Sequence, residues 1–444
     1  MLFLLILLLT IAGGREASAQ ATPVSHPDSL QARLLKAIRQ IPIIDNQAHP
    51  ALPGDVEMDA LTFDSTGVAS PVARTLPFRL RPTNLELIPA FHALYEYPHA
   101  DLSLDHLREL ATLKRKKRTA PEVNYFNTVL NKAGISLSLA NRVDMAGTPL
   151  DRTRFKWVPF LDAYLFPLNN SVYKKQGPES AVFFSCYEKL LKKYYDLVET
   201  SRPRTFEAYL RFVHESFSRL KADGAVAVKF AAAYLRPLAF DDVSPRQARR
   251  IYERYRNTTD VPEEEYRKLQ NYLFFFLLRE ATRFGLPVHI HTGAGMNEGF
   301  RLNGAHPLLL ENVVTANEFR QTRFVLLQGG APFTQEAILL ATNANVFVDT
   351  SGLTLLHYPS DLAAIFKQWL SLQPEKVLFA TDARVVNELI GAEEVYWLAT
   401  ENGRQALALA LSEMVQEKRC DEAEALRLAH LLLRDNAAKL YGLP

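Results

Sequence analysis

The feature that most restricts the fold of this chain is a series of short runs with strand-like composition, separated from one another by helical stretches. Eight such runs occur, at residues 41–46, 135–141, 156–162, 225–230, 287–291, 323–328, 345–349 and 376–382. Short strands that alternate with amphipathic helices predict parallel βα units. Eight units in a chain of 444 residues predict an α/β protein with a closed (β/α)8 barrel.

An open, doubly wound sheet is the alternative fold for alternating strands and helices. It would place a glycine-rich phosphate turn after the first strand, whereas residues 45–50 contain no glycine. The sequence therefore favours one barrel domain over residues 21–444, with insertions near 51–130 and 163–222. Residues 51–84 are proline-rich and predict a long loop over the site. The second insertion is aromatic-rich and helical, and we expect it to contribute to a substrate pocket.

The first 20 residues have the pattern of a secretory signal peptide. An apolar run at residues 2–11 precedes the small-residue stretch 17–21, and the run is too short to be a good membrane span. We expect cleavage after Ala19 or Ala21, a periplasmic or secreted mature chain, and no stable membrane span after cleavage. Because no Lys or Arg precedes the apolar run, an uncleaved anchor is the alternative.

Composition narrows the class of partner. Hydrophobic residues make up 48% of the chain, charged residues 23%, and the net charge is +2, which is typical of a globular protein and does not favour nucleic acid as a partner. The basic run at residues 114–118 is interpreted as a solvated helix face. Cys186 and Cys420 are expected to be free, buried thiols, and without a Cys-x-x-Cys spacing a thiolate metal site is not indicated.

Polar residues collect where the predicted strands end. In a (β/α)8 barrel the carboxyl ends of the strands form the active-site mouth, so the last polar residue of each strand is a site candidate. In chain order these are His49, Asn141, Asp162, Lys229, His291, Gln328, Asp349 and Asp382. His289 and His291 are two residues apart on one strand and must point to the same side of the sheet. A lysine, two histidines and several carboxylates at one mouth exceed what packing needs.

Five motifs carry a family resemblance. They are IIDNQAHP at 43–50, VHIHTG at 288–293, LLQGG at 326–330, FATDA at 379–383 and DNAAKLYG at 435–442. Together they resemble the amidohydrolase superfamily, in its amidohydrolase-related branch, over roughly residues 40–444. The resemblance implies a distorted barrel of the metal-dependent hydrolase type with one or two divalent ions, usually zinc. Metal-bound hydroxide would attack the substrate, while an aspartate moves the proton.

The resemblance assigns metal ligands to four positions of this chain. His49, His291 and Asp382 would hold one ion, with Lys229 as a further ligand, and Asp382 would also be the catalytic proton carrier. Each of the four also has a structural interpretation; Asp382, for example, would cap the following helix.

Two positions depart from the family pattern. Gln47 stands where the first histidine of His-x-His belongs, and Gln328 stands where the histidine of the sixth strand belongs. An amide oxygen binds zinc poorly but hydrogen-bonds well to a substrate oxygen or a carboxylate. We therefore expect one divalent ion, held weakly, or none, and we place both glutamines in the substrate-binding set.

Three further residues follow the strand ends. Tyr234, Arg236 and Arg384 are predicted to bind an anionic substrate at the lip of the barrel. Two functions remain open at this point. One is an exported hydrolase or lyase that acts on a small molecule through metal-activated water. The other is a catalytically degenerate barrel that binds a small molecule or a protein partner without turnover. Oligomeric state, a homo-oligomer included, is left open.

Overall fold

The computed structural model describes residues 29–51, 76–119, 124–143, 145, 148, 150–295, 300–387 and 389–444. The predicted signal peptide and most of the predicted loop at 51–84 lie outside the described residues. Across the described ranges, no helix combines the length and the apolar character that crossing a membrane requires.

All eight predicted strands are present, and neighbouring strands run parallel. Their bounds are β1 (Ile43–Ala48), β2 (Ile135–Asn141), β3 (Phe155–Val158), β4 (Val228–Phe230), β5 (Val288–His291), β6 (Phe324–Leu327), β7 (Val346–Asp349) and β8 (Val377–Leu378). Regular pairing joins β1 to β3 in order and β4 to β8 in order.

Two short junctions close these strands into a barrel. Phe160 pairs with Lys229 beyond the end of β3, and Ala48 of β1 pairs with Ala383 beyond the end of β8, both in parallel bridges. The amide of Asn46 also donates to the carbonyl of Phe379 at 2.8 Å. The fold is therefore a distorted (β/α)8 barrel, as the sequence predicts, and the distortion lies at β4 and β8, which have three and two residues.

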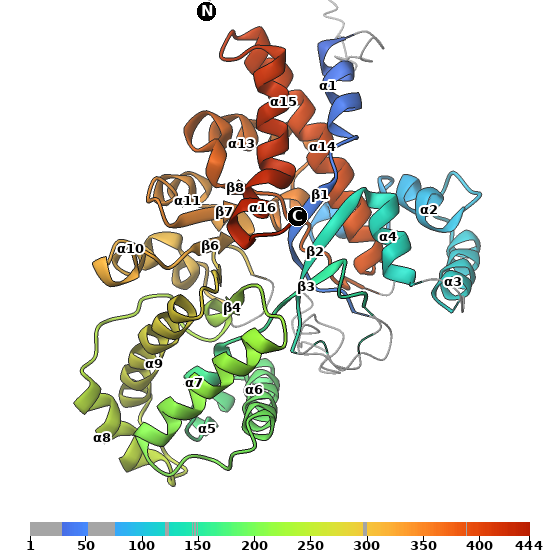
Figure 1. Ribbon diagram of the computed structural model, residues 1–444. Helices are drawn as coiled ribbons and strands as arrows, with labels where there is room; N and C mark the ends of the chain where they lie inside the picture. The colour runs from blue at the N-terminus through green and yellow to red at the C-terminus, as the bar shows by residue number, and fades with distance from the viewer. Residues whose placement is uncertain are drawn as a thin grey trace, which may run out of the picture.

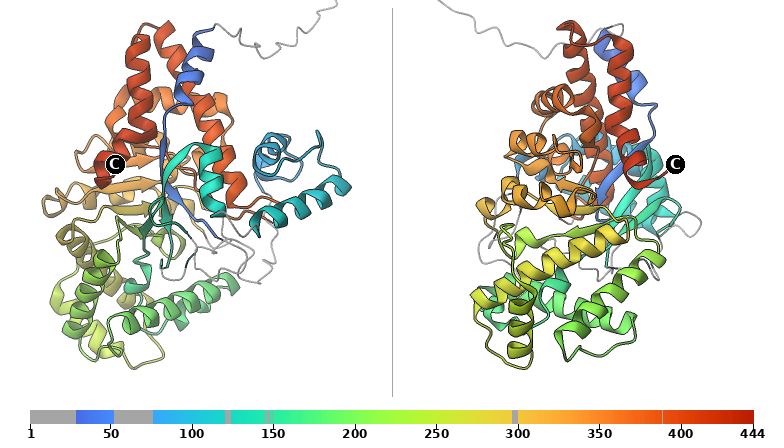
Figure 2. Two further views of the ribbon diagram at one scale, coloured as in Figure 1. Left: turned by 45° about the vertical axis from the view of Figure 1, so that its right-hand side comes forward. Right: turned by 60° about the vertical axis from the view of Figure 1, so that its left-hand side comes forward.

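Helices cover the barrel in two main groups. Their bounds are α1 (Leu30–Ile38), α2 (Leu87–Tyr95), α3 (Leu104–Arg118), α4 (Tyr125–Ala133), α5 (Ser171–Lys174), α6 (Pro178–Leu197), α7 (Phe206–Ala222), α8 (Pro245–Tyr255), α9 (Glu263–Arg283), α10 (Glu311–Val314), α11 (Thr334–Leu340), α12 (Leu353–Leu356), α13 (Pro359–Leu372), α14 (Ala392–Gln416), α15 (Glu422–His430) and α16 (Asn436–Tyr441). Helices α1, α13, α14 and α15 pack together at one end of the molecule, and α5 to α9 gather at the opposite end (Figures 1 and 2).

The barrel interior is apolar at the amino-terminal ends of the strands. Ile44, Leu137, Val325 and Leu378 form a buried cluster there, and α16 contributes Leu440 to it. Because aliphatic side chains and α16 fill this end, a ligand has access from the carboxyl ends of the strands.

The basic run in α3 is not a solvated face throughout, so that prediction is wrong at both ends of the run. Lys114 is 4% exposed, and its Nζ lies 2.7 Å from Glu394 Oε1. Arg118 pairs with Glu393 at 2.7 Å, whereas Arg115 and Lys116 are exposed. The reason is that the first turn of α14 buries two adjacent glutamates, and buried carboxylates need cationic partners.

The two cysteines are free, as predicted. Both are half-buried rather than buried, so that part of the prediction is wrong. Cys186 lies in α6 and Cys420 lies between α14 and α15. Burial raises the pKa of both thiols, which disfavours the reactive thiolate.

Candidate active site

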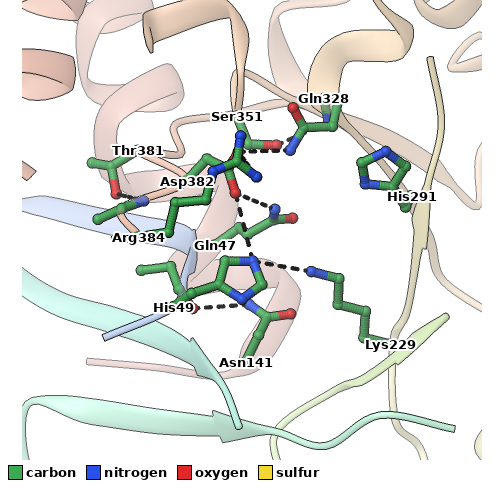
Figure 3. A network of polar contacts seen from close by, with 12 residues as sticks. Gln47, His49, Asn141, Lys229, His291, Gln328, Ser351, Thr381, Asp382 and Arg384 are labelled. Carbon is green, nitrogen blue, oxygen red and sulfur yellow. Dashed lines mark hydrogen bonds and ion pairs between the residues drawn. The ribbon is translucent and has the colours of Figure 1, made fainter. Parts of the chain in front are cut away.

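The predicted site residues come together at the carboxyl ends of the strands. Gln47 lies in β1 and His49 just after it, Lys229 lies in β4, Gln328 directly follows β6, and Asp382 lies in the segment after β8 (Figure 3). Residues far apart in sequence thus meet because parallel strands of a closed barrel end at the same mouth.

The carboxylate of Asp382 is the centre of the arrangement. Its Oδ1 accepts a hydrogen bond from Gln47 Nε2 at 2.9 Å and lies 3.5 Å from His49 Nε2. Its Oδ2 accepts from Gln328 Nε2 at 3.0 Å and lies 3.3 Å from Arg384 Nη1. Both carboxylate oxygens are therefore surrounded by nitrogen atoms of the protein.

Asp382 is held in place and is ionised. Its φ is 53°, in the left-handed region that few residues with a side chain adopt, and its amide donates to the carbonyl of Gln47 at 2.9 Å. Burial on its own would raise the pKa of this carboxyl, but Arg384, His49 and the bond from Gln328 outweigh burial and bring the pKa to about 2.

Gln328 is fixed by its neighbours after β7. It also has a left-handed φ, of 63°, and its amide donates to Asp349 Oδ1 at 3.0 Å and Ser351 Oγ at 2.8 Å. A Cβ on Gly352 would lie 2.0 Å from Gln328 Oε1. The side-chain oxygen of Gln328 thus packs where only a glycine leaves room, while its nitrogen donates to Asp382.

A second set of hydrogen-bonded polar side chains lies deeper in the barrel and supports the site. Asn46 Nδ2 donates to Asp349 Oδ2 at 2.9 Å, Tyr441 donates its hydroxyl proton to Asn46, and His289 Nε2 lies 2.7 Å from the Tyr441 hydroxyl. Burial raises the pKa of Asp349 to about 7. His289 and His291 thus lie in successive layers of the barrel interior, as their spacing predicts, and only His291 is at the mouth.

Three residues without a role predicted from the sequence, Ser351, Gly352 and Tyr441, position site residues. The usable signal was the small, polar run 349–352 directly after a predicted strand. Tyr441 lies in the motif at 435–442, but nothing in the sequence indicates that its hydroxyl reaches the first strand.

Lys229, His49 and Asp382 form a row. Lys229 Nζ lies 3.3 Å from His49 Nε2, the same atom that faces Asp382, and Nζ lies 5.4 Å from the ring centroid of Phe160. One nitrogen of the imidazole therefore lies between an amine and a carboxylate (Figure 3), which is a geometry for passing a proton.

His291 is set apart from Asp382 (Figure 3). Its Nε2 lies 3.0 Å from the carbonyl of Ala294, and since a carbonyl only accepts, Nε2 carries the proton. Burial lowers the pKa of His291 to about 3, so the ring is neutral. The ring of Tyr234 packs against it with a centroid distance of 4.6 Å.

Tyr234 separates this mouth from a side pocket. The pocket has a volume of about 350 Å³ and is lined by residues that include Tyr173, Arg236, Arg267, Gln270 and Arg301. It lies between the predicted helical insertion, which contributes α5 and α6, and helix α9. Arg267 is paired with Glu263 at 2.7 Å.

Arg236 lies in the wall of this pocket and is 8% exposed. Its Nη1 donates to Gln270 Oε1 at 3.1 Å, and its Nη2 donates to Asn271 Oδ1 at 2.7 Å and to the carbonyl of Ala239 at 2.9 Å. Burial lowers its pKa to about 10. None of its hydrogen-bond partners in the described part of the chain is a carboxylate, so Arg236 is a buried positive charge held by neutral dipoles.

The residues present do not fit a divalent ion. Both oxygens of Asp382 already face nitrogen atoms, and Gln47 turns its nitrogen rather than its oxygen to the carboxylate. Within the described ranges, no three His, Cys, Asp or Glu side chains are grouped so that they could hold a metal ion. An ion would have to displace Arg384 or the two amides.

Comparison with known proteins gives a family match and a set of similar folds. Residues 219–443 match the family model Amidohydro_2, described as amidohydrolase. Protein fluG of Emericella nidulans is 25% identical over 262 residues, which are 55% of this chain and 29% of that protein. The chain thus spans less than a third of the length of this curated relative.

Two solved structures resemble this one over nearly their whole length. A protein of Lactobacillus casei named as a metal-dependent hydrolase has a TM-score of 0.62 at 19% identity, covering 92% of this chain and 97% of its own. Uronate isomerase of Thermotoga maritima has a TM-score of 0.60 at 15% identity, covering 93% and 97%. At these identities the likeness concerns the fold.

Proposed function

The chain belongs to the amidohydrolase family, and on that basis we propose that it is a hydrolase or isomerase that acts on a small molecule at the mouth of the barrel. The observation that carries the proposal is the row of Lys229, His49 and Asp382, with Nζ–Nε2 and Nε2–Oδ1 distances of 3.3 and 3.5 Å. Three strands far apart in sequence deliver these groups to one point, which packing alone does not require.

The row supplies general acid–base chemistry. Asp382 is an ionised acceptor, and His49 Nε2 can donate to Asp382 or accept from Lys229 because it faces both. Hydrolysis, elimination and isomerisation all need a positioned proton acceptor and donor. Metal-activated water, which the family resemblance implies, is not part of this proposal, because the donor set does not fit a divalent ion.

We further propose that the substrate carries an anionic group and a hydroxyl group. Arg384 at the mouth and Arg236 in the side pocket are positive groups that can bind a carboxylate. Burial raises the pKa of Tyr234 to about 12, so this residue remains a neutral donor. Gln47 Oε1 is buried without a hydrogen-bond partner among the described residues, so it is available to accept from a hydroxyl. A hydroxy acid carries both groups.

The test is a substrate screen read by proton NMR, which detects hydrolysis and isomerisation alike. Wild-type protein would be incubated with uronates, lactones of dicarboxylic acids and N-acyl amino acids. Asp382→Asn should lower turnover of any substrate found by at least about 100-fold, with an unchanged circular dichroism spectrum. Asp260→Asn, an exposed carboxylate, is the matched control and should retain full activity.

Two outcomes would contradict this proposal. Full activity in Asp382→Asn would remove Asp382 from the chemistry. Tight binding of a hydroxy acid to the wild type with no conversion under any condition would instead support the degenerate barrel that binds without turnover.

We also propose that the chain is exported to the periplasm or the medium. Support comes from the apolar run at residues 2–11 and the small residues at 17–21. Intact mass of the protein from the extracytoplasmic fraction should correspond to a start at Gln20 or Thr22. A full-length mass on a membrane fraction would instead indicate an uncleaved anchor.

A further inference from the structure

We infer that the barrel mouth of this protein works without a divalent ion, because Arg384 and the side-chain amides of Gln47 and Gln328 occupy the carboxylate that such an ion would use. This inference goes beyond the proposed function, since it concerns the composition of the site and holds for any reaction there. Three features of the site carry it.

The first feature is that the lone pairs of Asp382 are in use. A carboxylate offers about four acceptor directions, and four nitrogen atoms surround this one, at 2.9 and 3.5 Å from Oδ1 and at 3.0 and 3.3 Å from Oδ2. The backbone bond to Gln47 and the positive φ fix the position of the residue. The carboxylate cannot turn toward an ion without losing at least one of these contacts.

The second feature is the orientation of the two amides. A carboxylate only accepts hydrogen bonds, so each glutamine must present its nitrogen to Asp382 and turn its oxygen away. For Gln328 the oxygen that is turned away packs against Gly352, where a Cβ would lie 2.0 Å from it. For Gln47 the single remaining oxygen is a neutral ligand to which zinc binds poorly.

The third feature is charge. The guanidinium of Arg384 places a positive charge 3.3 Å from Asp382 Oδ2. The side chain of Arg384 is 17% exposed, whereas that of Asp382 is fully buried, and solvent screens a buried pair weakly. A dication at the same carboxylate would be repelled by this charge. The guanidinium thus supplies the cation that the site needs.

The presence of a guanidinium in place of a metal ion limits the reactions that the mouth can catalyse. No ion is then required to polarise a carbonyl, so the work falls to hydrogen bonds and to proton transfer by side chains. Substrates with an activated ester, such as lactones, or with an enolisable carbonyl suit such a site. Unactivated amides, which lack a good leaving group, do not.

The first arm of the test uses wild-type protein without an affinity tag. The protein would be purified from zinc-supplemented medium, and its metal content measured by plasma mass spectrometry. Melting curves would then be recorded with a chelator and with added zinc. We expect well under one ion per chain and no change in melting temperature, because an ion that does not bind the folded state cannot stabilise it. One tightly bound ion per chain, with a loss of stability on chelation, would overturn the inference.

The second arm asks whether these three side chains are what excludes the metal. The variant Gln47→His with Gln328→His and Arg384→Met restores two imidazoles and removes the charge. Zinc should bind this variant and raise its melting temperature. A control variant, Gln321→His with Gln416→His, adds two histidines at exposed positions and should show no such rise.

The outcomes of the second arm are decisive in either direction when the triple variant folds. A folded triple variant whose melting is insensitive to zinc would overturn the assignment of metal exclusion to these residues. If the triple variant does not fold, the double variant Gln47→His with Gln328→His is measured in the same way, and the wild-type metal content by itself decides whether the mouth holds an ion.

Discussion

Lys114→Met should measurably destabilise the protein, because it leaves a buried carboxylate without its cation. Glu394 is fully buried and pairs with Lys114 at 2.7 Å, and Lys114 also donates to the carbonyl of Leu389 at 2.8 Å. That carbonyl lies in the segment between Asp382 and α14. Removing one partner of a buried pair costs about 3–5 kcal/mol. The lower end applies, since Tyr95 and the amide of Gly391 still donate to Glu394.

The size of the effect can be converted into a melting temperature. With an unfolding entropy of about 2.1 cal/mol/K per residue, a loss of about 3 kcal/mol lowers the Tm of a chain of 444 residues by about 3 °C. The assay is calorimetry at one scan rate. Lys116→Met, an exposed lysine of the same helix, is the matched control and should melt with the wild type.

The pH dependence of this variant has a definite sign. Burial raises the pKa of Glu394, Lys114 opposes this, and the adjacent Glu393 raises it again. Without Lys114 the pKa in the folded state rises further above the unfolded value, so folding disfavours the ionised form and stability falls as pH rises. The Tm deficit should therefore be larger at pH 8 than at pH 5. A Lys114→Met protein that melts with the wild type at pH 8 would refute this reasoning.

Two further substitutions test the support of the site. Gly352→Ala should destabilise the folded protein by about 1–3 kcal/mol and shift Gln328, because the glycine has a φ of 70° and an added Cβ would meet Gln328 Oε1. The control is Gly285→Ala, which has a φ of 65° and open space around it and so measures the backbone cost alone. Equal losses of Tm in the two variants would contradict a role for packing against Gln328. Tyr441→Phe should lower the free energy of unfolding by about 1–3 kcal/mol, since it leaves Asn46 Oδ1 without the hydroxyl that donates to it. A denaturation midpoint equal to that of wild type would show that this bond adds no stability.

The strands were predictable because each is a short, largely apolar run between polar or glycine-containing segments, and this pattern is local. Their order in a barrel followed from the alternation with helices, and the structure confirms all eight. Helix α3 was predictable as a helix, but the burial of Lys114 was not. That burial depends on Glu394 of α14, which is far away in the sequence, and no local pattern encodes it.

The members of the site were predictable from the rule that strand ends meet at the mouth, which brought His49, Lys229 and Asp382 together before any distance was known. The orientation of the amides was not predictable, because it depends on the carboxylate of Asp382, to which both side chains donate. Arg236 was expected at the lip, whereas its depth is set by Gln270 and by other groups of α9. Its role in substrate binding stays a prediction.

We infer that nitrogen donors, not an ion, hold the carboxylate of Asp382. Crystals soaked in zinc and measured on both sides of the zinc absorption edge test it directly. We expect no anomalous peak at the barrel mouth, with Gln47 Nε2 and Gln328 Nε2 at hydrogen-bond distance from Asp382, as in this structure at 2.9 and 3.0 Å. An anomalous peak at about 2.0–2.2 Å from a carboxylate oxygen of Asp382 and a nitrogen of His49 would contradict the account.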